Sequence, residues 1–85
     1  MTFVFSKHVL EGLHERNIPR ELVERVLQSP QQKVAEVENV TCYQSRVDMN
    51  EKQYLLRVMV NETTTPAKVV TAYRTSKITK YWRPS

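Results

Sequence analysis

The spacing of the hydrophobic residues changes once along the chain, at Ser29-Pro30. Before this point, apolar residues recur every three or four positions, which is the period of one helix face. After about Lys33 the chain is rich in β-forming residues, and between Gln53 and Val60 two sets of side chains alternate, as in a strand. Helices followed by consecutive strands with short links predict an α+β domain, in which the helices cover one face of an antiparallel sheet.

The helical segment is predicted to be a hairpin. Ser6 is expected to cap a first helix that runs to about Asn17. Pro19 begins the second helix, because proline is tolerated only in a first turn, and Ser29-Pro30 ends it. The apolar stripe of the first helix is Val9, Leu10 and Leu13. The apolar stripe of the second helix is Ile18, Leu22, Val23, Val26 and Leu27. Both stripes are expected to face the core.

The rest of the chain is predicted to form a four-stranded antiparallel sheet. The strands are expected over Lys33 to Glu38, Val40 to Val47, Gln53 to Val60, and Lys68 to Arg74. The links are expected to be turns at Glu38-Asn39 and Asp48 to Glu51, and a polar loop over Asn61 to Pro66. Ser76 to Trp82 fits either a short helix or an extended tail. A chain of 85 residues has room for one core, so residues 1–85 are expected to be a single domain.

Scarce residue types exclude several kinds of active site. Gly12 is the only glycine, whereas a P-loop or a Rossmann fingerprint needs several. Cys42 is the only cysteine, which excludes an internal disulfide and a multi-cysteine zinc site. The two histidines, His8 and His14, are not spaced to share one helix face, and Asp48 is the only aspartate. Neither a metal nor a cofactor is therefore expected.

The sequence also bears on location. No apolar run approaches the roughly 20 residues that a membrane-spanning helix needs. The first residues lack the basic region and long apolar stretch of a secretory signal. We therefore expect a protein that makes no membrane contact, in a reduced, cytoplasmic setting.

Positive charge is concentrated in the last part of the chain. The formal net charge is +4, and no acid follows Glu62. The basic residues that follow it are Lys68, Arg74, Lys77, Lys80 and Arg83. Such a segment attracts a polyanion such as RNA, or an acidic protein. The plain alternative is a basic tail that only keeps the protein in solution.

The remaining residue types are suited to metal-free chemistry on RNA. The 2′-OH of RNA is itself the nucleophile, so a protein needs only to neutralise the phosphate and move protons. Arginine and lysine supply charge, histidine and tyrosine transfer protons, and aromatic rings stack on bases. The residues expected to be catalytic are His8, Arg57, Tyr73 and Arg74. Those expected to bind RNA are Arg16, Arg46, Lys77, Lys80, Tyr81 and Trp82.

Strand alternation limits where these side chains point. If Leu56 and Val58 face the helices, Arg57 points to the opposite, open face of the sheet. The simplest arrangement then has Arg57 and Arg74 together on that open face, while Tyr73 points the other way unless a bulge intervenes. Each residue also has a structural alternative: a surface charge for the arginines, and packing against the core for Tyr73 and Trp82.

The order of several short motifs resembles domain-of-unknown-function family 4258. The motifs are His8, Glu15-Arg16-Asn17-Ile18, Ser29-Pro30, Leu56-Arg57-Val58, Val69-Val70-Thr71-Ala72-Tyr73 and Lys80-Tyr81, and they extend over nearly the whole chain. The resemblance implies a relation to the RelE and BrnT type of ribonuclease toxins, with a helical hairpin on a four-stranded antiparallel sheet. It also implies an antitoxin that covers the basic face, and it places functional weight on His8, Arg16, Arg57, Tyr73, Lys80 and Tyr81. One departure is Gly12, which stands where family members often carry an arginine.

Three hypotheses follow. The first is a metal-independent endoribonuclease toxin, paired with an acidic antitoxin-like protein. The second is a non-catalytic module that binds nucleic acid or an acidic protein through the same basic face, and it predicts salt-sensitive binding without cleavage. The third is an adaptor that adds a partner strand to a sheet edge.

Overall fold

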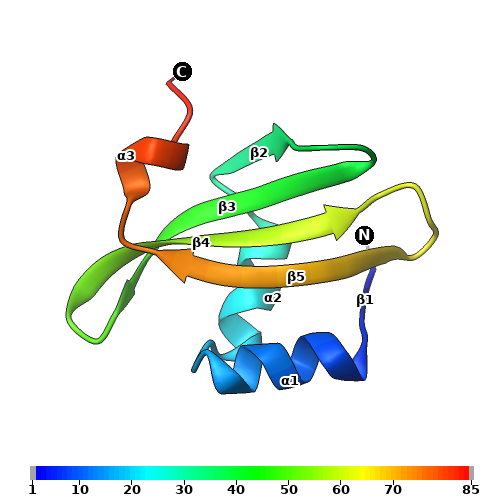
Figure 1. Ribbon diagram of the computed structural model, residues 1–85, viewed down its shortest axis with the longest axis horizontal. Coiled ribbons are helices and arrows are strands. Elements are labelled where there is room, and N and C mark those ends of the chain that lie inside the picture. The colour runs from blue at the N-terminus through cyan, green and yellow to red at the C-terminus, as the bar shows by residue number, and fades with distance from the viewer. Residues whose placement is uncertain (1, 85) are drawn as a thin grey trace.

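The computed structural model describes residues 2–84, and it shows an α+β fold with a five-stranded mixed sheet (Figure 1). The elements in chain order are β1 (Phe3–Phe5), α1 (Lys7–Glu15), α2 (Arg20–Gln28), β2 (Gln32–Ala35), β3 (Val40–Met49), β4 (Lys52–Asn61), β5 (Ala67–Thr75) and α3 (Ile78–Tyr81). The strand order across the sheet is β1-β5-β4-β3-β2. The last four strands in the chain pair antiparallel, as predicted.

The prediction of a wholly antiparallel, four-stranded sheet was wrong at one edge. Phe3–Phe5 forms β1, which pairs parallel with β5 from Phe3 opposite Ala67 to Phe5 opposite Val69. Three residues are too few to show a strand period, and their partner lies more than sixty positions along the chain. The pairing is therefore a tertiary effect that local sequence patterns do not predict.

The two N-terminal helices begin and end close to the predicted positions. The Ser6 hydroxyl accepts a hydrogen bond from the Val9 backbone N–H at 3.1 Å, so it caps α1. Asn17 ends the turn after α1 in a left-handed conformation (φ 55°), which asparagine tolerates better than most residues. Pro19 then stands at the N-cap of α2, and Ser29 at its C-cap. The predicted hairpin is confirmed.

The hairpin between β3 and β4 is tighter than expected. Only Asn50 and Glu51 form the turn, both with positive φ (53° and 63°), so the strands extend to Met49 and from Lys52. Such two-residue turns match the twist of the paired strands. The predicted turn at Glu38-Asn39 is confirmed, again with positive φ at both residues.

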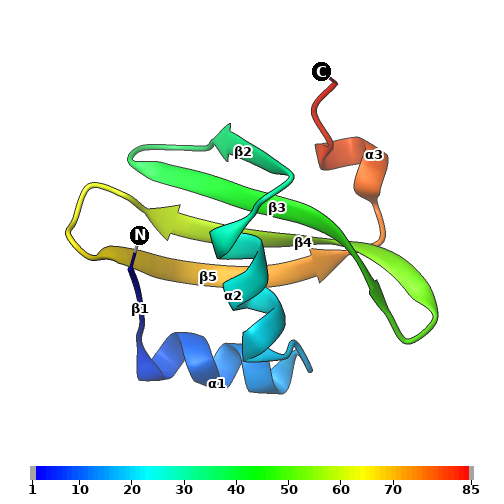
Figure 2. The same cartoon turned by 180° about the vertical axis from the view of Figure 1, so that it is seen from behind.

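Both α1 and α2 lie against one face of the sheet, and Figure 2 shows α2 crossing in front of the strands with α1 on the β5 side. The main core lies between them: Val23, Leu56, Val58 and Val60 are all fully buried. Removing these apolar surfaces from water is the main force that holds the helices on the sheet. We call this side of the sheet the helix face.

The opposite side, which we call the second face, is not open at its centre. It buries Cys42, Gln44, Leu55 and Arg57, and α3 lies next to these residues. The segment after β5 is thus a short helix, which decides between the two expected forms. In Figure 1, α3 lies beyond the end of β5, on the far side of the sheet from α1.

Candidate functional site

The most unusual group on the second face is the Arg57 guanidinium, which is only 4% exposed. Its Nε donates to Gln44 Oε1 at 2.9 Å, and its Nη1 donates to Tyr73 Oη at 2.7 Å. Its Nη2 lies 3.5 Å from Glu36 Oε2, and the Tyr81 ring centroid lies 4.3 Å from its central carbon. A buried charge needs such partners, because an unpaired one is very costly.

Strand register explains this row of side chains. Gln44 on β3 and Tyr73 on β5 are the direct cross-strand partners of Arg57 on β4. Direct partners project from the same face of a sheet, so the three polar groups meet without help from any loop. We call Gln44, Arg57 and Tyr73 the polar row.

Gln44 was not among the predicted site residues, although it is fully buried. Its Nε2 donates to Gln32 Oε1 at 2.7 Å and to the Tyr81 carbonyl at 3.2 Å. Its Oε1 accepts from Arg57 and, at 3.7 Å, from the Cys42 thiol. The available signal was the expected pairing of the strands Val40 to Val47 and Gln53 to Val60, which brings Gln44 near Arg57.

The electrostatics of the polar row keep Arg57 charged. Burial acts to lower the pKa of Arg57, but the hydrogen bond to Tyr73 and the nearby Glu36 carboxylate outweigh it, so the pKa is raised. Burial also raises the pKa of the Cys42 thiol, despite the nearby Arg57 charge. Cys42 is therefore a neutral, buried thiol.

The expectation that Arg57 and Arg74 share the second face was wrong. The register of β5 shifts beside Met59 and Val60, so Val69 pairs with Val60 while Thr71 pairs with Met59. This bulge at Val70 turns Tyr73 toward Arg57 and leaves Arg74 on the helix face, opposite Leu56.

Arg74 is held at the end of the helix face, near the turn between α1 and α2. Its Nη1 donates to the Asn17 carbonyl at 3.4 Å and to Met49 Sδ at 3.9 Å. Its guanidinium also lies 5.1 Å from the Tyr54 ring centroid. Arg74 therefore lies on the opposite face of the sheet from the polar row and makes its contacts there.

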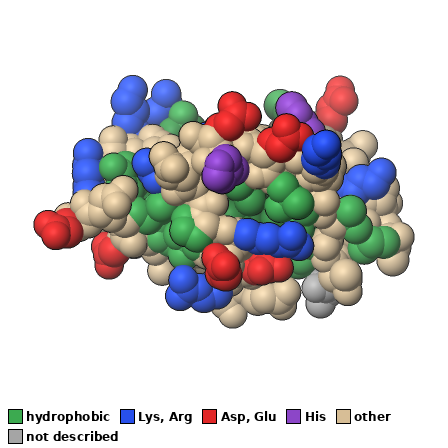
Figure 3. Space-filling view, turned by 90° about the horizontal axis from the view of Figure 1, so that it is seen from below, with side chains coloured by type: hydrophobic (Ala, Val, Ile, Leu, Met, Phe, Trp, Pro, Cys, Tyr) green, Lys and Arg blue, Asp and Glu red, His purple; other side chains and the backbone are tan. Residues whose placement is uncertain are grey.

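His8 and Arg16 are also separated from the polar row. They line a cavity of about 320 Å³ between α1 and β5, together with Gly12, Val70 and Thr71. Arg16 Nη1 donates to the Ala72 carbonyl at 3.4 Å and would lie 2.9 Å from a Cβ on residue 12, so glycine leaves room for its guanidinium. Figure 3 shows the α1 side of the molecule, where histidines lie among both acids and bases. The four predicted catalytic residues are therefore not one site.

The predicted RNA-binding residues near the C-terminus do come together. Arg46 on β3 lies 4.1 Å from the Trp82 ring centroid, and Lys80 lies 5.3 Å from that of Tyr81. Two hydrogen bonds join the Gln32 amide to the Arg83 backbone, at 2.5 and 3.1 Å. The cations here are exposed, whereas Tyr81 and Trp82 are half-buried. We call Arg46, Lys77, Lys80 and Arg83 the basic α3 surface.

An ionic cluster lies on the helix face, where β2, β3 and the loop after β4 meet. The Tyr43 hydroxyl donates to the Glu62 carboxylate, and Lys33 Nζ lies 3.1 Å from Glu62 Oε2. The bond from Tyr43, and then that from Lys33, lowers the pKa of Glu62 below its usual range. Burial, followed by the bond to Glu62, raises the pKa of Tyr43. The Phe3 ring meets Tyr43 edge-on at 5.7 Å, so this cluster ties β1 to the core.

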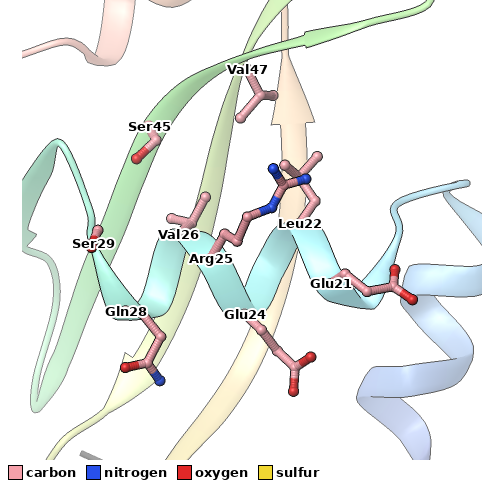
Figure 4. A pocket seen from close by; sticks show the side chains of 9 residues that line it. All are labelled: Glu21, Leu22, Glu24, Arg25, Val26, Gln28, Ser29, Ser45 and Val47. Atoms are coloured by element: carbon pink, nitrogen blue, oxygen red, sulfur yellow. The ribbon is translucent and has the colours of Figure 1, made fainter.

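A shallow groove of about 600 Å³ lies between α2 and β3 (Figure 4). Its floor is apolar, with Leu22, Val26 and Val47, while Arg25 extends over it and Glu24 points away from the sheet. The groove is on the helix face, so it is separate from the polar row, which lies on the second face. None of the predicted site residues lines it.

Within residues 2–84, no three His, Cys, Asp or Glu side chains gather as a metal site would require. Over the same residues, no helix has the length and hydrophobicity to cross a membrane.

Comparison with known protein families gives a match. The family model described as Domain of unknown function (DUF4258) matches residues 5–74, which include α1, α2 and the four antiparallel strands except for Thr75, the last residue of β5. No curated protein matches the chain, and no solved structure does. A match over this much of the sequence shows that the chain belongs to the DUF4258 family.

Proposed function

We propose that this protein binds single-stranded RNA through the basic α3 surface. The observation that carries the proposal is the stacking of Arg46 on Trp82 at 4.1 Å, which joins a basic residue of β3 to the acid-free C-terminal segment. Exposed cations beside aromatic rings are typical of surfaces that follow a nucleic-acid backbone. Phosphates would lie along Arg46, Lys77, Lys80 and Arg83, all of them exposed.

Salt dependence tests this proposal. Neutralising four phosphates of a single strand gives a slope of about −3 for log affinity against log salt concentration. We expect Lys80→Ala to weaken binding of a fluorescein-labelled 12-nucleotide RNA and to make this slope shallower by about 0.7. Lys7→Ala, an exposed cation on α1, is the matched control and should change neither quantity. Fluorescence anisotropy measures both, and equal losses for the two variants would contradict the proposal.

A second candidate is metal-independent RNA cleavage at the polar row, as in the RelE and BrnT type of toxins. The supporting observation is that Glu36 and Tyr73 both contact Arg57. Glu36 would take the proton from the 2′-OH as its oxygen bonds to phosphorus. Arg57 would neutralise the phosphate, and Tyr73 would donate its proton to the 5′-oxygen as the P–O5′ bond breaks. The products are a 2′,3′-cyclic phosphate and a 5′-hydroxyl.

Incubation of end-labelled RNA with the protein in EDTA tests this second candidate. Cleavage by wild type, lost in Tyr73→Phe and Glu36→Gln while both variants stay folded, is the expected pattern. RNA that stays intact on incubation with wild type would exclude free RNA as a substrate. An acidic antitoxin-like protein belongs to this candidate too, and it would compete with RNA for the basic α3 surface.

A further inference from the structure

We infer that Gln44 and Arg57 form a binding site for a uracil base, and that Tyr81 of α3 occupies this site in the present structure. The inference rests on the proposed RNA binding and names what one part of the surface recognises. Tyr81 makes two contacts of different kinds there. Its ring stacks on the Arg57 guanidinium at 4.3 Å, and its backbone carbonyl accepts a hydrogen bond from Gln44 Nε2 at 3.2 Å.

These two contacts are the ones that a pyrimidine base would make. Bases splayed out of a single strand stack on guanidinium planes and are read along their edges by hydrogen bonds. Gln44 offers only a donor, because its Oε1 already accepts from Arg57 and Cys42. Uracil has one six-membered ring, the size of the tyrosine ring, and two carbonyl acceptors on its edges, whereas adenine has two fused rings and accepts only through ring nitrogens.

The site is held in place without α3. Arg57 is fixed from three sides by Gln44, Tyr73 and Glu36, and Gln44 is fixed further by Gln32. None of these anchors belongs to α3. If Tyr81 left, the guanidinium and the amide would therefore keep their orientation, so a base would not have to order them.

In contrast, α3 is held by few contacts. It has four residues, no buried side chain and no side-chain hydrogen bond at its N-cap. A helix of this length is not stable by itself in water. Its attachments are the Gln32 bonds to Arg83, the Gln44 bond to Tyr81, and the stacking of Arg46 and Arg57 on Trp82 and Tyr81. None of the salt bridges among residues 2–84 involves α3.

Trp82, the residue after Tyr81, makes the same kind of stacking contact at a neighbouring position. Arg46 is two residues after Gln44 on β3, so both side chains project from the second face, about 7 Å apart along the strand. Trp82 stacks on Arg46 as Tyr81 stacks on Arg57. Two consecutive aromatic residues thus occupy two neighbouring stacking positions, as two consecutive bases would.

The consequence is competition between Tyr81 and an RNA base for the site at Gln44 and Arg57, while the cations of the basic α3 surface stay exposed to phosphates. When the competent state is only partly populated, the apparent affinity falls by that fraction. Removing the Tyr81 ring should therefore strengthen RNA binding, whereas a tyrosine that stacks on RNA directly would weaken binding when removed. The sign of the effect separates this inference from the prediction that Tyr81 is itself an RNA-binding residue.

The test is the affinity of full-length Tyr81→Ala for fluorescein-labelled 12-mers of uridine and of adenosine at low salt. We expect the uridine 12-mer to bind about tenfold tighter than to wild type, which is the gain if Tyr81 occupies the site about nine-tenths of the time. Binding of the adenosine 12-mer should gain less. Tyr54→Ala is the matched control, because it removes a tyrosine that stacks on an arginine, Arg74, on the helix face. Gln44→Leu added to Tyr81→Ala should abolish the preference for uridine.

Equal or weaker uridine binding by Tyr81→Ala, with wild type still binding RNA, would overturn this inference and leave the proposed function standing. If neither protein binds RNA, both fail. If Tyr81→Ala does not fold, Tyr81→Leu serves instead, because it removes the aromatic ring and leaves Gln44, Arg57 and the stacking of Arg46 on Trp82 unchanged; it should also bind more tightly.

Discussion

The two faces of the sheet are both buried at their centres, but they are built from different chemistry. On the helix face, Leu56 and Val58 pack against α2 through apolar contacts alone. On the second face, Gln44 and Arg57 are buried in a hydrogen-bonded network next to a four-residue helix. Buried ionic groups seldom contribute more stability than apolar ones of the same volume. The helix face therefore accounts for the fold, and the second face is where a function is to be sought.

The largest effect in this comparison is expected on the helix face. Leu56→Ala removes a fully buried side chain from the main core and leaves a cavity. We expect the free energy of unfolding to fall by about 3 kcal/mol, measured by urea denaturation followed by circular dichroism. A loss below about 1 kcal/mol would mean that the main core lies elsewhere.

A double-mutant cycle on the second face gives the next largest effect. Gln44→Leu leaves the Arg57 Nε and the Tyr81 carbonyl without their partner, so we expect a loss of about 1–3 kcal/mol. The double variant Gln44→Leu/Arg57→Met replaces both buried polar groups by apolar ones and should recover most of this loss. Additive losses would show that the polar row stabilises the fold much as the helix face does.

Gly12→Ala should have a smaller effect, of opposite sign. A Cβ at this position would approach Arg16 Nη1 to 2.9 Å, and a flexible guanidinium can move away. Alanine is favoured over glycine inside a helix by about 0.5–1 kcal/mol, so the variant should be more stable than wild type. The thermal midpoint measures this. A less stable variant would show that the position of Arg16 against Ala72 is important for packing α1.

The smallest expected effect is a pH dependence at the end of the helix face. The pKa of Glu62 is lowered in the folded protein, so its contribution is present above its unfolded pKa of about 4.3 and is lost as the pH falls through its folded pKa. Because Glu62 is partly exposed, the contribution should stay below about 1 kcal/mol. Urea denaturation of Glu62→Gln at pH 7 and at pH 3 should show a smaller difference than wild type does. If the variant shows the same difference between pH 7 and pH 3 as wild type does, Glu62 does not contribute to the loss of stability in acid.

Sequence patterns predicted the parts of the fold that local interactions determine. The cap at Ser6, the break at Pro19 and the alternation along β4 each depend on neighbours within a few residues. The parallel pairing of β1 depends on a partner that is distant in sequence. The face from which Arg74 projects depends on the bulge at Val70, and no glycine or other turn residue near Val70 indicates a bulge there.

The site was predicted less completely than the fold. Alternation correctly placed Arg57 on the face opposite the helices, but burial there depends on α3, whose form the sequence left undecided. The separation of His8 from Arg57 follows from the packing of α1 on the helix face. Residue types alone do not reveal such separations, because they carry no information on which elements meet.

The most direct test of the account is to map RNA binding onto the two faces by NMR. Titration of the ¹⁵N-labelled protein with a 12-nucleotide uridine RNA would show which residues change. We predict shifts of the Gln44 side-chain amide, Arg46, the Arg57 Nε–H and the residues of α3, with α1 unaffected. Shifts confined to His8, Arg16 and their neighbours on α1 would contradict the account and move the binding site to the other side of the sheet.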